Sequence, residues 1–151
     1  PVKQVIDAYK KYGKTIIGLS EVDPSEVSQF GVIGGEELGD GVYKIDKFIE
    51  KPKKEDAPSN LVQVGINIIT PDVFDILKDM KNGKSGEIRL ADAYEIMLQK
   101  GIPLYGKKIE GEWLDTGNKL NFIKATLKLG IKNDEIGEDL KKMIKDLVKT
   151  F

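Results

Sequence analysis

The stretch Thr15-Ile16-Ile17-Gly18-Leu19 decides the fold of this chain. It is apolar and β-branched but too short for a helix, which favours a strand that is buried on both faces. Directly before it, Val2 to Tyr12 carries apolar side chains at helical spacing, and Gly13 stands where a helix takes its left-handed cap. A helix followed at once by a fully buried strand is typical of an α/β sheet.

Further strands are predicted after this pair of elements. Residues 30–33 and 42–49 are bracketed by glycines, so we expect strands joined by polar turns at Gly34-Gly35 and at 39–41. The segment Asp23-Pro24-Ser25-Glu26 precedes them and is expected to begin a helix, because it offers a capping side chain and a proline for the first turn.

Residues 61–69 predict one more buried strand, in which Gly65 is a position without a side chain. Thr70 is expected to cap the helix that follows. A loop is predicted at 82–86, and Asp92 is expected to cap a further amphipathic helix.

Residues 104–109 and 112–114 predict two short strands, and Asn118 is expected to cap the first of two closing helices. The apolar residues expected to face inward are Leu120, Ile123, Leu127 and Leu129 in the first helix, and Leu140, Ile144, Leu147 and Val148 in the second. This order predicts an α/β fold with a sheet of mixed direction. We expect a single domain, with a sheet part at about 1–116 and C-terminal helices at 117–151.

The composition narrows the chemistry. The chain has 24 basic and 25 acidic residues and a net charge of −1, so it has no general attraction for a nucleic-acid polymer or an anionic membrane. It has no cysteine and no histidine, which excludes disulfides, thiolate nucleophiles, histidine bases and the usual zinc ligands.

Without a long apolar stretch or a secretory signal, a cytoplasmic location is expected. The chain begins with Pro1 and a helical pattern, and is expected to continue a longer protein.

A charged pair stands at the end of a predicted strand, in Glu50-Lys51-Pro52. The proline favours a change of direction that turns both side chains toward one cleft. A carboxylate accepts hydrogen bonds from sugar hydroxyls and an ammonium group neutralises phosphate oxygens, so this pair can hold a sugar phosphate. An exposed pair that merely closes a strand is the alternative, and the dipeptide alone fits it well.

Two glycines and one aspartate are further candidates. Gly31 and Gly65 lack side chains where a ligand could approach the backbone, although a turn at Gly31 or a bulge at Gly65 would also account for them. Asp115 follows an apolar segment and precedes a helix, which suits a magnesium ligand, since Mg²⁺ takes one or two carboxylates together with phosphates and water. A turn or capping role explains Asp115 equally well.

Taken together, Phe48-Ile49-Glu50-Lys51-Pro52, Gly65 and Trp113-Leu114-Asp115-Thr116-Gly117 resemble the sugar-nucleotide pyrophosphorylases. Within that family the uridylyltransferases acting on glucose 1-phosphate fit best. Three further segments support the narrower match, namely 57–61, 86–93 and 115–120. The resemblance implies a Rossmann-like sheet of which only the C-terminal part is present. The glycine-rich nucleotide loop with its arginine is absent from this sequence.

The resemblance also implies roles for individual residues. Glu50 would bind the sugar hydroxyls and Lys51 the phosphate. Gly31, Val64 and Gly65 would line the sugar. These enzymes convert UTP and glucose 1-phosphate to UDP-glucose and pyrophosphate by alignment and charge neutralisation, so no nucleophile is needed.

Asp115 would bind Mg²⁺ together with an aspartate of the absent half. Lys51 and Asp115 are therefore the expected catalytic residues. Lys119 could sit near phosphate, although a solvated helix lysine fits it better. In the segment around Glu87, Arg89 and Ala91 depart from the common family form.

Two alternatives stay open at this point. One is a thymidylyltransferase for the same sugar phosphate, and the other is a noncatalytic binding or assembly module. The chain alone is expected to be inactive. Because part of a sheet would be absent, free strand edges and a homo-oligomer or an exchange of elements between chains are expected. The two closing helices are the candidates for an oligomer contact.

Overall fold

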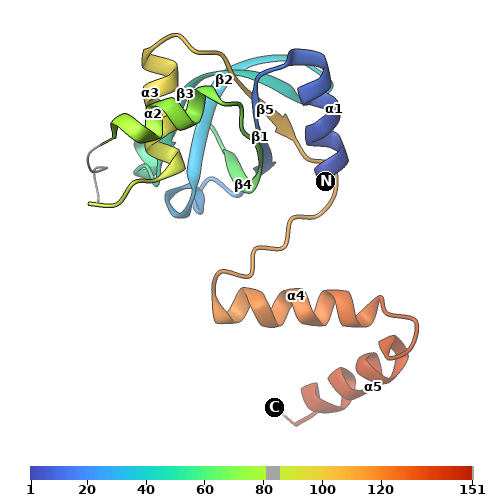
Figure 1. Cartoon of the computed structure of the whole chain (residues 1–151). Helices are drawn as coiled ribbons and strands as arrows, with labels where there is room; N and C mark the ends of the chain where they lie inside the picture. Colours follow the sequence, from blue (N-terminus) through green and yellow to red (C-terminus); the bar gives the residue numbers. More distant parts are fainter. Residues whose placement is uncertain (81–85, 151) are drawn as a thin grey trace. The chain divides into compact units, whose positions relative to one another are not determined.

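The computed structural model of the chain describes residues 1–80 and 86–150 (Figure 1). Contacts within the chain divide it into two compact units, Pro1–Gly111 and Glu112–Phe151. Within the described residues, the first unit contains five strands and three α-helices, and the second contains two α-helices.

The strands of the first unit form a single sheet that closes on itself. They are β1 (Thr15–Glu21), β2 (Gly31–Gly39), β3 (Val42–Glu50), β4 (Leu61–Ile68) and β5 (Leu104–Lys108). Their order is β1-β4-β2-β3-β5, and β5 pairs in parallel with β1 to complete the ring. The other pairings are antiparallel, so the predicted mixed direction is confirmed.

Closure of the sheet corrects one expectation. Free strand edges were expected, yet each described strand pairs on both sides. The strand pairing is shortest between β2 and β4, where the paired residues are Val32 and Val62. The sheet is thus closed in its strand order, although a single residue pair joins β2 to β4.

The strand β1 lies at the centre of the first unit. Its first five residues are buried, as the sequence predicted. Ile17 and Leu19 belong to the larger core, which also contains Tyr94 and Met97, whereas Ile16 belongs to a smaller core on the opposite face. Successive side chains of a strand point to opposite faces, so this one apolar run supplies both cores.

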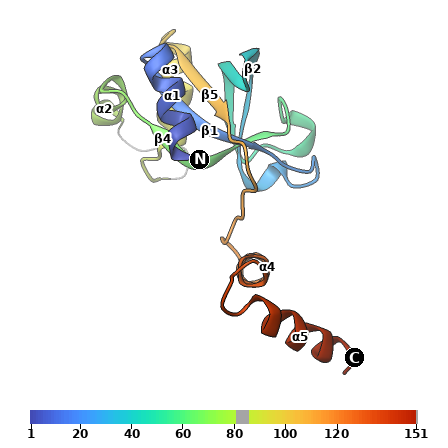
Figure 2. The ribbon, with the colours of Figure 1, turned by 90° about the vertical axis from the view of Figure 1, so that its right-hand side faces the viewer.

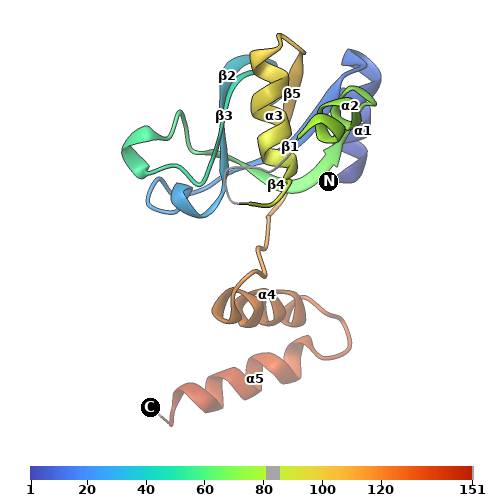
Figure 3. The ribbon, with the colours of Figure 1, turned by 60° about the vertical axis from the view of Figure 1, so that its left-hand side comes forward.

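Three helices cover the two faces of the sheet. They are α1 (Val2–Tyr12), α2 (Asp72–Asp79) and α3 (Leu90–Gln99). Helix α1 packs over β1 and β5 (Figure 2), and α3 lies alongside β3 and β5 (Figure 3). Helix α1 has the predicted bounds, and Gly13 ends it with a left-handed φ of 61°.

One of the two expected turns is absent from the structure, and the other is present. Gly34-Gly35 lies inside β2 and forms no turn; Gly34 pairs with Lys47 and Gly35 with Ile45, so these glycines lie opposite a bulge in β3. The turn predicted at 39–41 is confirmed, because β2 and β3 are joined at Asp40-Gly41, where both residues have positive φ. Asp23 accepts hydrogen bonds from Ser25 and is followed only by a short 3-10 helix, Val27–Gln29, in place of the expected longer helix.

Two expected helix caps are wrong for a common reason. The Thr70 hydroxyl lies 2.8 Å from the Thr15 hydroxyl, and α2 begins without a side-chain cap. Asp92 lies within the first turn of α3, where it accepts from Arg89. In both cases a buried polar side chain took a partner other than the backbone of the helix start. The predicted loop at 82–86 lies, except for Gly86, outside the described residues.

The second unit consists of α4 (Lys119–Ile131) and α5 (Gly137–Val148), and 112–114 forms no strand. Asn118 caps α4 as predicted, because its side-chain oxygen accepts from the Asn121 amide at 2.9 Å. The expected inward positions include five that are more than half exposed in the structure: Leu120, Ile123, Leu129, Leu147 and Val148. The two helices meet where Gly130 faces Leu140, one of the expected inward positions, since a Cβ on Gly130 would lie 2.6 Å from the Leu140 side chain. None of the described helices is both long and apolar enough to cross a membrane.

Candidate functional site

The candidate site in the first unit is built at the end of β3. Glu50 is the last residue of β3 and lies opposite Gly31, the first residue of β2. The next amide, that of Lys51, donates to the carbonyl of Phe30 at 2.9 Å. The hairpin therefore stays paired up to the charged residues, and this holds the backbone of Glu50 in place.

The Glu50 carboxylate is half enclosed by protein. Its Oε2 atom is buried and has no hydrogen-bond partner within the described part of the chain. A Cβ placed on Gly31 would lie 2.8 Å from this oxygen and 2.6 Å from the Phe48 ring. Gly31 is thus no turn glycine, and its missing side chain makes room for Glu50. A buried acceptor without a donor is costly, so it marks a position where a ligand could donate a hydrogen bond.

Lys51 departs from the strand. Its φ is 47°, in a region that non-glycine residues rarely adopt, and its side chain is exposed. The change of direction before Pro52, expected from the sequence, is therefore present. Strained backbone of this kind often accompanies functional positions. An exposed ammonium group beside a half-buried carboxylate can meet the charged end of a ligand whose neutral end contacts Glu50.

Val64 and Gly65 lie on β4, across the sheet. Gly65 has a φ of 76°, is exposed, and has no atom within 4 Å of the position that a Cβ would take. Between the pairs Ile17–Asn67 and Leu19–Gln63, β4 has more residues than β1, so Gly65 lies in a bulge. The bulge accounts for the glycine, and it also leaves the backbone at Gly65 open to approach. The Val64 side chain lies 3.3 Å from the position of a Cβ on Gly18.

Arg89 and Asp92 form an ion pair that the sequence analysis did not assign to the site. The Arg89 guanidinium donates to both carboxylate oxygens of Asp92, at 3.3 and 3.2 Å. The hydrogen bond to Asp92 raises the pKa of Arg89, and the carboxylates of Glu50 and Glu87 act in the same direction. Arg89 thus lies within electrostatic range of Glu50. Arg89 is the only arginine in the sequence, and this was the one feature that could have pointed to it.

Aromatic packing fixes the wall behind Glu50. Phe48, two residues earlier on the same face of β3, meets the Tyr94 ring of α3 edge to face at 5.4 Å between centroids. Tyr94 is fully buried, and its hydroxyl has no hydrogen-bond partner among residues 1–80 and 86–150. Burial raises the pKa of this hydroxyl to about 12. The packing beside Glu50 is therefore apolar, apart from one hydroxyl that is neutral at pH 7.

Asp115 belongs to the second unit and forms a turn. Its Oδ1 atom accepts from the Gly117 amide at 3.0 Å, which is the turn role considered above. Its Oδ2 atom has no hydrogen-bond partner in the described ranges, so this oxygen fits the part of one magnesium ligand. Within those ranges, no cluster of three or more acidic side chains could hold a metal by itself. A metal at Asp115 would therefore need further ligands.

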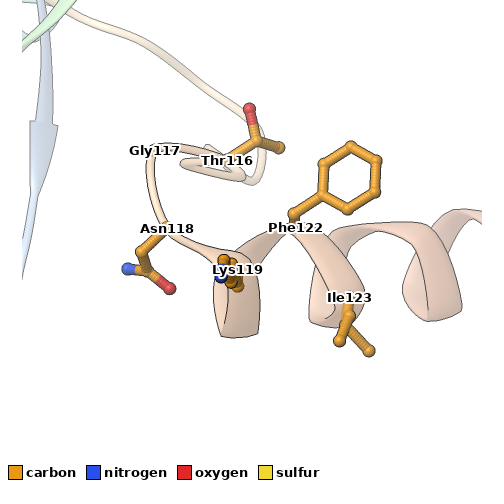
Figure 4. Close-up of a pocket in the computed structure, with 6 residues that line it drawn as sticks. All are labelled: Thr116, Gly117, Asn118, Lys119, Phe122 and Ile123. Carbon is orange, nitrogen blue, oxygen red and sulfur yellow. The ribbon is translucent and has the colours of Figure 1, made fainter.

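A shallow hollow of about 700 Å³ lies at the start of α4 (Figure 4). The loop contributes Thr116, Gly117 and Asn118, and the helix contributes Lys119, Phe122 and Ile123. The hollow is thus polar toward the loop and apolar toward the helix. Lys119 is exposed at its rim, as a solvated helix lysine would be.

Residues 1–131 match the nucleotidyl transferase family, so this chain belongs to that family. The expected α/β fold class, a mixed sheet followed by C-terminal helices, is confirmed by this match and by the solved structures that it resembles. The family transfers nucleotidyl groups, which agrees with a site that contains carboxylates, lysines and backbone but no nucleophile.

Named relatives narrow the similarity. UTP-glucose-1-phosphate uridylyltransferase 2 of Staphylococcus saprophyticus is 38% identical over 146 residues, which are 97% of this chain and 50% of that protein. UTP-glucose-1-phosphate uridylyltransferase of Staphylococcus epidermidis is 39% identical over the same shares. The structure of a UDP-glucose pyrophosphorylase complexed with UDP-glucose is 40% identical, with a TM-score of 0.81 over 87% of this chain and 49% of that one. This chain spans about half the length of the curated relatives it matches.

Proposed function

We propose that this chain is the sugar-phosphate-binding half of a UTP-glucose-1-phosphate uridylyltransferase. The whole enzyme would form UDP-glucose and pyrophosphate from UTP and glucose 1-phosphate. The resemblance of Glu50-Lys51-Pro52 and of the segment ending in Asp115-Thr116-Gly117 supports this assignment, as do the names of the relatives. The chain by itself would bind the sugar phosphate without turning it over.

One observation carries the proposal, namely the unpaired Oε2 atom of Glu50. Burying an acceptor without a donor costs free energy that a bound hydroxyl group would recover. Gly31 leaves the space in which this oxygen lies, and Phe48 packs beside it. A carboxylate placed in this way suits the hydroxylated face of a sugar better than it suits solvent.

The remaining site residues would contact different parts of the ligand. Lys51 would neutralise the phosphate oxygens and align them for attack on the α-phosphorus of the nucleotide, with pyrophosphate as the leaving group. Gly31, Val64 and Gly65 would line the sugar, because missing or small side chains admit it. The nucleotide itself would be held by residues that this chain lacks.

Nucleotidyltransferases of this kind generally use a divalent metal. Asp115 would supply one carboxylate oxygen to Mg²⁺, and the phosphates, water and a second acidic side chain would complete the coordination. When bound, the metal neutralises the charge that develops on the phosphates. The hydrogen bond from the Gly117 amide to Asp115 Oδ1, which leaves Oδ2 without a partner among the described residues, supports this role.

The use of UTP by the whole protein is a proposal, since the residues that recognise the base of the nucleotide would lie outside this chain. A thymidylyltransferase of the same sugar phosphate therefore remains the alternative within the enzyme class. A homo-oligomer or element-exchanged assembly and a cytoplasmic location also stay predictions.

Calorimetric titration of glucose 1-phosphate into the chain tests the site. Glu50→Gln should weaken binding about tenfold or more, because a charged acceptor is replaced by a group that also donates. Lys51→Met should act similarly through the phosphate. Glu36→Gln and Lys47→Met are matched controls on exposed positions of β2 and β3. Unchanged affinity in both site variants would refute the assignment.

A further inference from the structure

Three neighbouring strands align Gln63, Gly31 and Glu50 in one row across the sheet. Gly31 lies opposite Glu50 in the β2–β3 pairing. Val32 lies opposite Val62 in the antiparallel β2–β4 pairing, so one step back along β2 and one step forward along β4 bring Gly31 beside Gln63. Residues aligned in this way point their side chains to the same face. The middle position of the row therefore has no side chain, and the two outer positions carry polar ones.

Both outer side chains lean over the glycine. A Cβ on Gly31 would lie 2.8 Å from Glu50 Oε2 and 2.9 Å from Gln63 Nε2. The two polar atoms are therefore no more than about 5.7 Å apart, the sum of these two distances, and yet they do not bond to each other. An acceptor and a donor thus stand side by side above the glycine, each without a partner among the described residues.

The Gln63 amide differs from the Arg89 guanidinium. Arg89 is already engaged by Asp92 through two hydrogen bonds. The side-chain amide of Gln63 has no such partner in the described part of the chain, although it is partly buried and the rest of β4 is mainly apolar. The Gln63 amide is not among the buried groups without a partner, so water reaches it, and a ligand hydroxyl beside Glu50 could take the place of that water.

We propose that Gln63 is a specificity-determining residue that binds the same sugar hydroxyl as Glu50. A hydroxyl group both donates and accepts, so it can donate to Glu50 Oε2 while its oxygen accepts from Gln63 Nε2. A carbonyl oxygen or an ammonium group could satisfy only one of the two. The pair therefore selects a hydroxylated ligand, and Gly31 is the residue that lets the two side chains meet. This inference rests on the proposed function, which supplies the sugar.

The test compares glucose 1-phosphate with its four mono-deoxy analogues, lacking the 2-, 3-, 4- or 6-hydroxyl, in titrations of the whole chain. Gln63→Leu should weaken binding of glucose 1-phosphate about tenfold, and one analogue should bind the unaltered chain about tenfold more weakly than glucose 1-phosphate does. That analogue should bind Gln63→Leu and the unaltered chain equally, because the contact is already absent. Gln99→Leu, on an exposed position near the end of α3, is the matched control and should change nothing.

Each outcome has a distinct meaning. If the unaltered chain binds no glucose 1-phosphate, the proposed function fails and this inference fails with it. If glucose 1-phosphate binds but Gln63→Leu leaves its affinity unchanged, or lowers the affinity of all four analogues by the same factor, only the Gln63 inference is overturned. Gln63→Glu keeps the size of the side chain, and at pH 8 it should weaken binding at least as much, since it replaces the donor with a second acceptor.

Discussion

The two units of this chain contain apolar residues in similar patterns but bury them very differently. In the unit 1–111, strands and helices enclose large side chains such as Ile17, Leu19 and Tyr94 completely. In the unit 112–151, the described buried residues are Ala125 and Gly137. The comparison teaches that an amphipathic pattern predicts a helix but not what covers its apolar face.

Polar groups show the same contrast. The described side-chain atoms that are buried without a hydrogen-bond partner, Glu50 Oε2, Asn67 Oδ1 and Tyr94 Oη, all lie in the first unit. A closed sheet with helices on both faces excludes water, so a polar group there depends on the protein or on a ligand for its partners. The polar groups of the helical unit can be satisfied by solvent.

A matched pair of leucine truncations should show the largest difference. Leu19→Ala removes a side chain with 0% exposure and should lower the free energy of unfolding by about 2–5 kcal/mol. Leu120→Ala removes one that is 61% exposed and should change it by no more than about 0.5 kcal/mol. Denaturant midpoints measure both. A costly Leu120→Ala would mean that Leu120 is covered in solution, and the contrast between the units would then fail.

Raising the pH should destabilise the first unit through its buried Tyr94, with an effect of intermediate size. The pKa of Tyr94 is about 12 in the folded chain, above its ordinary value near 10. A raised pKa means that its contribution to stability is complete below pH 10 and is lost as the pH rises toward 12, by about 2–3 kcal/mol in total. Unfolding midpoints between pH 8 and 12 measure this loss.

Tyr94→Phe is the control for that titration. In this variant, the free energy of unfolding should no longer fall with pH through the ionisation of Tyr94. The smaller fall due to Tyr43, whose pKa is also raised by burial, should remain. At pH 7 the substitution should be neutral or slightly stabilising, because it removes a buried hydroxyl without a partner. An unchanged alkaline transition would show that water reaches Tyr94 in solution.

Acid titration of the second unit should give the smallest effect. The Lys128 ammonium donates to the Glu112 carboxylate and holds the pKa of Glu112 below its ordinary value. A lowered pKa means that the stabilisation is present above about pH 4.5 and is lost as the pH falls through the folded value. Both side chains are about half exposed, so solvent screens the pair and the change in helical circular dichroism should be slight. Glu112→Gln should abolish it, and an equal change in that variant would exclude the pair as its cause.

Local signals predicted the elements whose partners are close in sequence. The helix 2–12 with its glycine end, the buried strand that follows, and the Asn118 cap all depend on residues within a few positions of each other. Predictions failed where a side chain found a partner elsewhere, as Thr70 did with Thr15, 55 residues away. A hydroxyl group can cap a helix or pair with another hydroxyl, and only the folded chain decides between them.

The candidate site divides in the same way. By itself the sequence determined the residue types and their order: a carboxylate and an ammonium group before Pro52, glycines in strands, and an aspartate before a helix. These follow from local chain direction and side-chain chemistry. Only the tertiary structure decided that Gln63 and Glu50 flank Gly31, because strand register brings together residues that no local pattern connects. It also decided which apolar faces are buried, since burial depends on the packing of distant elements.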